Sequence, residues 1–175
     1  LIDQIMYMYD AKVTNVFCKM YSINYPDVDD NFRLTMTLDN GVTAHIEVST
    51  NNFIKHPRWY VLGKDGTLQI DDWDCEGKII RCKDREDTWS AEIPKSKAGP
   101  SKTMAPRSDD SVDIIPISAP EDVVDNLNPT YWQLIDTLDG KCELKIKPEQ
   151  AMRVIKVMEA AFQSSETGEA IKTDI

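Results

Sequence analysis

Two stretches on either side of a sharp turn constrain the fold of this chain most. Apolar and polar side chains alternate in residues 32–38 (FRLTMTL), and they alternate again in residues 42–49 (VTAHIEVS). Between them stands Asp39-Asn40-Gly41, a sequence typical of tight β-hairpin turns. A period of two gives each strand one apolar and one polar face. This pair therefore predicts an antiparallel sheet that is covered on one side only.

Further short strands are expected on both sides of this hairpin. Residues 13–23 have the composition of a strand, and residues 58–62 (RWYVL) and 67–70 (TLQI) predict a second hairpin around a glycine-containing turn. Residues 78–82 (KIIRC) add another strand. Residues 13–82 therefore predict about six strands in a largely antiparallel meander.

Three segments have the spacing of amphipathic helices. Residues 1–12 place apolar side chains at i, i+3, i+4 and i+7, a second segment runs from Pro129 to Gly140, and Pro148 begins a third. The third helix is followed by a short strand in residues 170–175. We expect its apolar stripe to pack on the apolar face of the sheet; the stripe consists of Ala151, Val154, Ile155, Met158 and Phe162.

The predicted fold class is α+β, a largely antiparallel open sheet of about six or more strands, with helices packed on one face and the other face polar and available for oligomerisation. We expect residues 1–175 to form a single domain. Residues 84–125 are rich in Ser, Pro, Lys and Asp, and we expect a polar insertion there that is partly mobile. Within it residues 112–117 (VDIIPI) predict one strand, which Pro116 places at a sheet edge.

Charge and cysteine content restrict the partners. With 30 acidic against 20 basic residues the net charge is -10, whereas a protein that binds nucleic acid or an anionic membrane needs a basic face. No apolar run approaches the roughly 18 residues of a membrane span. The four cysteines are far apart and form no C-x-x-C motif. We therefore expect neither a disulfide framework nor a metal site, and a cytoplasmic location.

Four segments together resemble one known family. Their order and spacing are similar to those of the Gfo/Idh/MocA oxidoreductases, the family of glucose–fructose oxidoreductase and inositol dehydrogenase. The segments are LIDQIMYMYDAKVTNVFCKM, DNGVTAHIEVSTN, WYVLGKDGTLQIDDWD and KPEQAMRVIKVMEAAFQSSETGEAIKTDI. The resemblance covers nearly the whole chain apart from about residues 84–125. No single one of these motifs is diagnostic.

The resemblance implies an enzyme in two parts. Family members have a Rossmann domain that binds NAD or NADP, followed by an α+β domain that completes the substrate site and builds the oligomer. Nothing in this chain resembles the first part, since no G-x-G-x-x-G follows a strand. The family's catalytic Lys, Asp and His would then lie before Leu1. We expect this fragment to bind no cofactor, to be inactive alone, and to form a homo-oligomer, a dimer or tetramer, through its polar sheet face.

Four residues are candidate substrate-binding residues. The resemblance places Asp3 one helical turn beyond the family's His, where it is able to orient that imidazole. Alternatively, Asp3 is simply an acidic residue that the helix dipole favours in a first turn. Asn52, His56 and Arg58 belong to a loop near a strand end, and Asn52 or Arg58 is able to bind hydroxyls or a carboxylate. The alternative is a polar loop with an incidental histidine. The full-length substrate implied is a sugar, a cyclitol or a related hydroxyl or carbonyl compound.

The remaining chemistry-bearing residues favour structural interpretations. His45 lies in mid-strand beside Glu47 on the polar face, where we expect a solvated or interfacial histidine. The tryptophans are too scattered for a stacking platform. Residues 71–74 (DDWD) lack the spacing of a calcium loop and predict an acidic turn.

Two other functions stay open at this point. The first is a non-catalytic binding or scaffold module of the same fold. The second is a secreted adhesive α+β domain, which would require paired cysteines.

Overall fold

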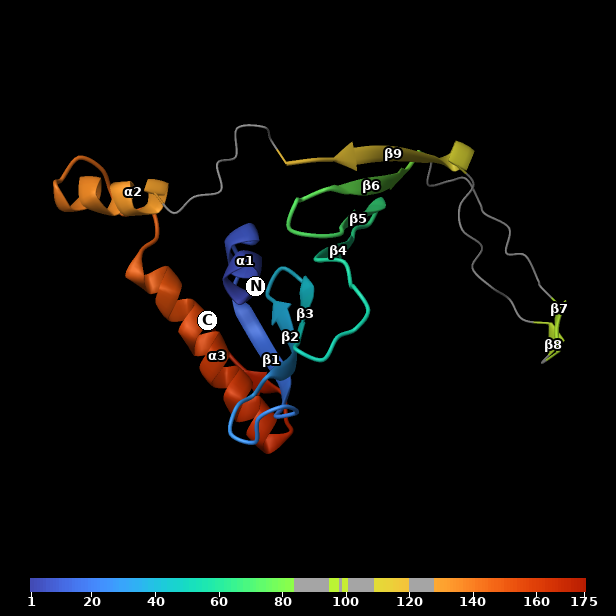
Figure 1. Cartoon of the computed structure of the whole chain (residues 1–175), viewed down its shortest axis with the longest axis horizontal. Coiled ribbons are helices and arrows are strands. Elements are labelled where there is room, and N and C mark those ends of the chain that lie inside the picture. Colours follow the sequence, from blue (N-terminus) through green and yellow to red (C-terminus); the bar gives the residue numbers. More distant parts are fainter. Residues whose placement is uncertain (84–94, 98, 101–108, 120–127) are drawn as a thin grey trace. The chain divides into compact units, whose positions relative to one another are not determined.

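The computed structural model describes residues 1–83, 95–97, 99–100, 109–119 and 128–175 (Figure 1). The chain divides into two compact units, one made of Leu1–Phe53 and Asn126–Ile175 and the other of Ile54–Asp125. Each unit contains one four-stranded antiparallel sheet, and the described α-helices belong to the first unit. The predicted α+β class is confirmed. The strands form two sheets instead of one continuous meander, because the irregular residues 50–58 separate the first three strands from the next.

The first unit combines the two ends of the chain. Its elements are α1 (Ile2–Met8), β1 (Val13–Tyr21), β2 (Asn31–Leu38), β3 (Thr43–Ser49), α2 (Asn128–Leu138), α3 (Pro148–Thr167) and β10 (Ile171–Lys172). The strand order is β10-β1-β2-β3. The β2–β3 hairpin forms at the predicted turn, where Gly41 has φ +85° and donates its N–H to Leu38 O at 3.1 Å.

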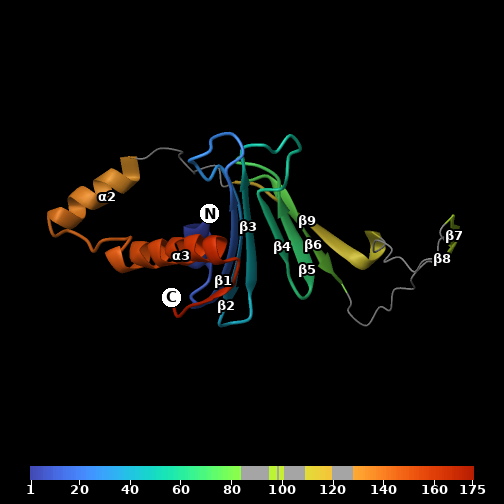
Figure 2. The same cartoon turned by 90° about the horizontal axis from the view of Figure 1, so that it is seen from below.

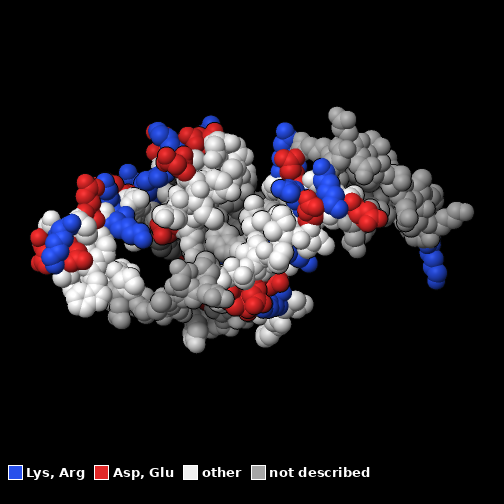
Figure 3. Space-filling view, turned by 90° about the horizontal axis from the view of Figure 1, so that it is seen from above, with Lys and Arg blue, Asp and Glu red and all other residues white. Residues whose placement is uncertain are grey.

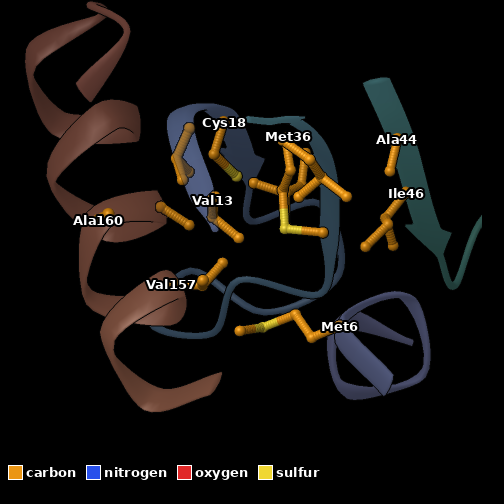
Figure 4. Packing of buried hydrophobic residues seen from close by; sticks show 12 residues of the cluster. Met6, Val13, Cys18, Met36, Ala44, Ile46, Val157 and Ala160 are labelled. Carbon is orange, nitrogen blue, oxygen red and sulfur yellow. The ribbon is translucent and has the colours of Figure 1, made fainter. Parts of the chain in front are cut away.

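The hydrophobic core of this unit lies between the sheet and α3, which runs along one face of the sheet (Figure 2). Figure 4 shows Val157 and Ala160 of α3 directed toward Val13 and Cys18 of β1. Burial raises the pKa of the Cys18 thiol, which is consistent with its behaviour as a small apolar side chain. The buried cluster consists of Met6, Val13, Val16, Cys18, Leu34, Met36, Leu38, Ala44, Ile46, Val157, Ala160 and Ala161.

The face of α3 that meets the sheet differs from the predicted stripe. Val154 packs against the core as expected, but Ile155, Met158 and Phe162 are 49%, 41% and 46% exposed. The side chains that face β1 are smaller, and three of them are Ala160, Ala161 and Ser164. Small side chains let the helix backbone approach the strand closely, so the helix is rotated from the orientation that its largest apolar residues predict.

Two serines of α3 explain this rotation further. The N–H of Cys18 donates to Ser164 Oγ at 2.9 Å, and the N–H of Met20 donates to Ser165 Oγ at 3.0 Å. Strand β10 pairs only with Asn15 and Val16, so these serines serve the part of the β1 edge that β10 leaves open. Ser164 is fully buried and also donates to Glu169 O at 2.6 Å.

The second unit is built around another four-stranded sheet, in the order β4-β5-β6-β9. Its elements are β4 (Trp59–Leu62), β5 (Gly66–Ile70), β6 (Gly77–Cys82), β7 (Lys95–Ser96), β8 (Gly99–Pro100), η1 (Asp109–Ser111) and β9 (Val112–Ile117). The predicted strand in 112–117 is confirmed as β9, and it lies at the sheet edge as Pro116 indicated. Most of the remainder of the predicted 84–125 insertion lies outside the described residues.

Helix α2 makes few contacts with the described elements. Its apolar side chains follow helical spacing and are largely exposed; they are Tyr131, Leu134, Ile135 and Leu138. Within the described part of the chain, no helix has the length and apolar content needed to cross a membrane.

Candidate functional site

The outer face of the first sheet, opposite α3, carries the polar side chains that alternate with the core residues. Cross-strand pairing orders them into four rows. From one end of the sheet to the other the rows are Asn15–Thr37–Thr43, Phe17–Thr35–His45, Lys19–Arg33–Glu47 and Tyr21–Asn31–Ser49. We refer to these twelve residues as the outer face.

The outer face combines hydrogen-bonded polar pairs with exposed aromatic rings. Arg33 Nε donates to Glu47 Oε1 at 3.2 Å, and Thr35 Oγ1 lies 3.0 Å from His45 Nδ1. Phe17 and Tyr21 are 42% and 41% exposed on the same face. Exposed aromatic side chains among polar groups are typical of surfaces that bind another molecule.

A polar network fixes the loop at the Tyr21 end of this face. The Asp30 carboxylate accepts the backbone N–H of Ile23 at 3.0 Å and that of Asn24 at 2.6 Å, and Asn31 Nδ2 at 2.5 Å. These bonds, led by the one from Ile23, lower the pKa of Asp30 to about 2. The loop between β1 and β2 is therefore held by hydrogen bonds that favour the ionised form of this carboxylate.

The same network reaches the end of β3. Asn24 Nδ2 donates to Thr50 Oγ1 at 2.7 Å, and both Asn24 and Asn31 donate a side-chain N–H to Asn51 Oδ1 at 3.1 Å. Asn31 is 5% exposed. Residues far apart in the sequence are thus joined into one preorganised cluster.

Beside this cluster the surface of the first unit forms a hollow of about 350 Å³. Its lining comes from the end of β1, the start of β2 and the end of β3, together with Ile23 and Asn51 from the adjoining loops. Aromatic, aliphatic, amide and charged side chains all contribute. We call this depression the β2–β3 hollow.

The four predicted substrate-binding residues fall in different parts of the chain. Asp3 is exposed in the first turn of α1, which precedes the Val13 end of β1. Asn52 follows β3 at the opposite end of these strands, beyond Asn51 of the network. His56 and Arg58 belong to the second unit. The structure therefore separates Asp3 from Asn52 within the first unit and keeps His56 and Arg58 in one loop of the second unit.

In the second unit the predicted loop packs against the acidic turn. The guanidinium of Arg58 lies over the ring of Trp73, 3.3 Å from its centroid, and Lys55 Nζ pairs with Asp72 Oδ2 at 2.8 Å. This hydrogen bond from Lys55 is the main reason that the pKa of Asp72 is lowered. His56 is exposed.

The predicted acidic turn is confirmed. The N–H of Trp73 donates to Asp72 Oδ1 at 2.9 Å, and the N–H of Glu76 donates to Asp74 Oδ1 at 3.1 Å. Over the described residues, no three His, Cys, Asp or Glu side chains come together as a metal site requires.

Sequence reasoning did not single out the residues of the β2–β3 hollow. Arg33 and Glu47 were recognisable only as polar positions of alternating strands, and Asn31 as the end of the turn-forming segment 26–31 (PDVDDN). The density of Asp and Asn in that segment was the one available signal, and it indicates a turn without indicating a partner.

Charge is mixed on the surface. Lys and Arg side chains lie interspersed with Asp and Glu on the face shown in Figure 3. That face presents no continuous basic area of the kind that binds nucleic acid.

Comparison with known proteins places these features in context. Residues 1–69 match the model of the GFO/IDH/MocA C-terminal domain. No curated protein matches the sequence. An NAD-binding protein from Listeria innocua, known from its crystal structure, is 34% identical in sequence. The match covers 98% of this chain and 49% of the Listeria chain, with a TM-score of 0.85.

Two more distant structures share the fold. The WlbA dehydrogenase from Bordetella pertussis, solved with NADH and UDP-GlcNAcA, is 13% identical, with 99% of this chain and 44% of its own covered and a TM-score of 0.62. An oxidoreductase from Agrobacterium radiobacter, solved with NAD+, L-tartaric acid and magnesium, is 14% identical, with 98% and 46% covered and a TM-score of 0.58. This chain spans about half the length of each of these proteins.

Proposed function

This chain carries the C-terminal domain of the GFO/IDH/MocA family, and from that premise we propose that it is the substrate-binding and oligomerising portion of an NAD(P)-dependent oxidoreductase. The observation that carries the proposal is the similarity to the Listeria NAD-binding protein, which extends over 98% of this chain but only 49% of the relative. The substrate class is a sugar, a cyclitol or a related hydroxyl or carbonyl compound.

The described residues do not fit a dinucleotide. A dinucleotide pyrophosphate is held where a parallel strand leads through a glycine-rich turn into a helix N-terminus. Every strand pair in the described part of the chain is antiparallel, and none of its helices follows such a turn. We therefore assign NAD or NADP to a part of the protein outside this sequence and derive no catalytic step within it.

The role of this chain is then to bind and orient the substrate. The Arg58 guanidinium lies over the ring of Trp73, and its N–H groups are donors of the kind that bind a hydroxyl or carboxylate. Asp3, Asn52 and His56 are exposed polar side chains of the kind that bind hydroxyl groups. They stay proposals, each to be tested by substitution.

Self-association is proposed to use the outer face. The exposed rings of Phe17 and Tyr21, on either side of the row Lys19–Arg33–Glu47, support this assignment. Phe17→Glu is expected to shift a dimer or tetramer toward monomer in sedimentation experiments. Phe53→Glu, which alters an equally large exposed ring in a loop beyond β3, is the matched control. Equal behaviour of the two variants would remove the outer face as the interface.

The decisive experiment for the redox function uses the full-length protein. Purified protein is screened against polyols and sugars with NAD and with NADP, and nucleotide reduction is followed at its absorbance band. We expect turnover with at least one polyol, loss of turnover in Arg58→Ala, and none with the 175-residue chain alone. Failure of the full-length protein to bind either nucleotide would overturn the proposal.

The second candidate function is a non-catalytic binding or scaffold module. This chain covers only about half of each relative, and the redox half is known from those relatives alone, which favours this second candidate. Nucleotide binding without turnover of any polyol would support it. We also propose a cytoplasmic location, which is consistent with the absence of a disulfide among Cys18, Cys75 and Cys142 of the described residues.

A further inference from the structure

We propose that Trp73 is a positioning residue for Arg58, whose guanidinium it holds in place for the substrate. This rests on the proposed function, which assigns Arg58 to substrate binding. Both residues belong to the second unit. Arg58 ends a loop directly before β4, and Trp73 lies in the acidic turn between β5 and β6.

Trp73 lies outside any hydrophobic core. The residue is 80% exposed, although tryptophan is among the side chains that gain most from burial. A ring exposed to this extent adds little to the free energy of folding. The contact that the structure gives the ring is with Arg58, whose guanidinium carbon lies 3.3 Å from the ring centroid. The role of Trp73 is therefore local, and it concerns Arg58.

Hydrogen bonds fix the turn that presents this ring. The N–H of Asp71 donates to Glu76 O at 3.1 Å, which closes the turn. Inside it, the N–H of Cys75 donates to Asp72 O at 3.3 Å. The N–H of Trp73 itself donates to Asp72 Oδ1 at 2.9 Å. The indole is thus attached to a backbone that is already ordered.

The Asp72 carboxylate also ties the Arg58 loop to this turn. Lys55 Nζ lies 2.8 Å from Asp72 Oδ2, three residues before Arg58. The hydrogen bond to Asp72 is the main reason that the pKa of Lys55 is raised. At exposed sites an ion pair and a cation–π contact are each weak. Together they hold both ends of the segment 55–58 against the turn.

An arginine that is held in advance binds its ligand at a lower entropic cost. The arginine side chain has many rotamers, and the freedom among them is lost when its N–H groups bind a hydroxyl or a carboxylate. The contact with Trp73 removes part of this freedom before the substrate arrives. The gain is limited by the strength of the cation–π contact, which at an exposed site corresponds to roughly two- to fivefold in affinity.

The test uses the full-length protein and steady-state kinetics. The substrate is myo-inositol, sorbitol or D-glucose, whichever the wild type oxidises fastest. Trp73→Leu is expected to raise KM roughly two- to fivefold and to leave kcat unchanged, because a preorganised binding contact is lost. Trp73→Phe keeps an aromatic face and should keep most of the affinity. Trp132→Leu, which removes a 63% exposed indole from α2, is the matched control and should change neither constant.

Two further readouts show whether Trp73 acts through Arg58. Arg58→Gln removes the charge that the ring attracts but keeps an amide donor, so adding Trp73→Leu to this variant should not raise KM further. In NMR spectra the Arg58 side-chain signals should lie upfield through the ring current of Trp73. Trp73→Leu should return them to ordinary positions, whereas Trp132→Leu should not.

Three results would overturn the proposal. The first is a KM of Trp73→Leu equal to that of the wild type, and the second is the same fold increase when Trp73→Leu is added to Arg58→Gln. The third is the absence of an upfield shift at Arg58 in the wild type. Failure of the proposed function has a different signature, since the wild type would then oxidise none of the three compounds. The ring-current shift would still decide whether Trp73 holds Arg58.

Discussion

The two sheets of the chain have four strands each but bury very different amounts of side chain. In the first sheet, alternate residues of β1, β2 and β3 belong to one buried cluster under α3. In the second sheet, Val112 is the single buried apolar side chain among the described residues, and rings and branched side chains of β4 and β9 are exposed. A sheet with one covered face is stabilised by its own core, whereas the described residues of the second sheet bury little apolar surface of their own.

The largest expected effect tests this difference directly. Leu34 in β2 is 2% exposed and Leu62 in β4 is 73% exposed. Leu34→Ala should lower the free energy of unfolding by about 2–5 kcal/mol, because it leaves a cavity in the core, and the same change at Leu62 should cost less than about 1 kcal/mol. Urea denaturation of both variants measures this. Equal losses would show that the second sheet is buried to the same extent.

The serine contacts to β1 give the next largest effect. Ser164→Ala removes the acceptor of the Cys18 N–H and the donor to Glu169 O in a fully buried position. We expect a loss of about 1–3 kcal/mol in the free energy of unfolding. Ser165→Ala should cost less, because water reaches its half-buried site. Hydrogen exchange of the Cys18 amide is a second readout, and unchanged protection in Ser164→Ala would contradict the assignment.

A pH-dependent effect concerns the loop between β1 and β2. The folded pKa of Asp30 is about 2, below the ordinary value of 3.8, so the folded state binds fewer protons than the unfolded state. Its contribution to stability is present above about pH 4 and is lost as the pH falls toward about 2. Asp30→Asn should therefore be less stable than the wild type at neutral pH, and the gap should close on acidification.

The control for this measurement lies in the same loop. Asp27→Asn removes a carboxylate from the same loop without removing any of the Asp30 hydrogen bonds, and it is the matched control variant. Urea midpoints at a series of pH values give the comparison. A gap between Asp30→Asn and the wild type that does not change with pH would show that the Asp30 bonds do not depend on its charge.

Local patterns predicted the local structure well. The hairpin at Gly41 and the last strand depend on neighbouring residues and were visible in the sequence. The orientation of α3 was not visible in the sequence. The helix has two apolar stripes, and which of them packs on the sheet depends on Ser164 meeting the open edge of β1. That edge exists only because β10 is short.

The candidate site shows the same limit. The polar outer face followed from alternation, but the β2–β3 hollow requires Asn31 and Asn51 to meet across 20 residues of sequence. The substrate-binding prediction grouped Asn52 with His56 and Arg58 because they are neighbours in the chain. The structure assigns Asn52 to one unit and the other two to the next. Proximity in sequence is a weak guide where a loop joins two compact units.

The smallest expected effect asks whether the two sheets differ where their environments are alike. Arg33–Glu47 on the first sheet and Arg81–Asp113 on the second are exposed cross-strand ion pairs, with nitrogen–oxygen distances of 3.2 and 3.1 Å. Double-mutant cycles should give a coupling of about 0.2–1 kcal/mol for each, decreasing with added salt. A much stronger coupling at Arg33–Glu47 alone would mean that the neighbouring network around Asn31 holds this pair in place. Side chains that are fixed in advance do not lose the conformational entropy that weakens exposed ion pairs.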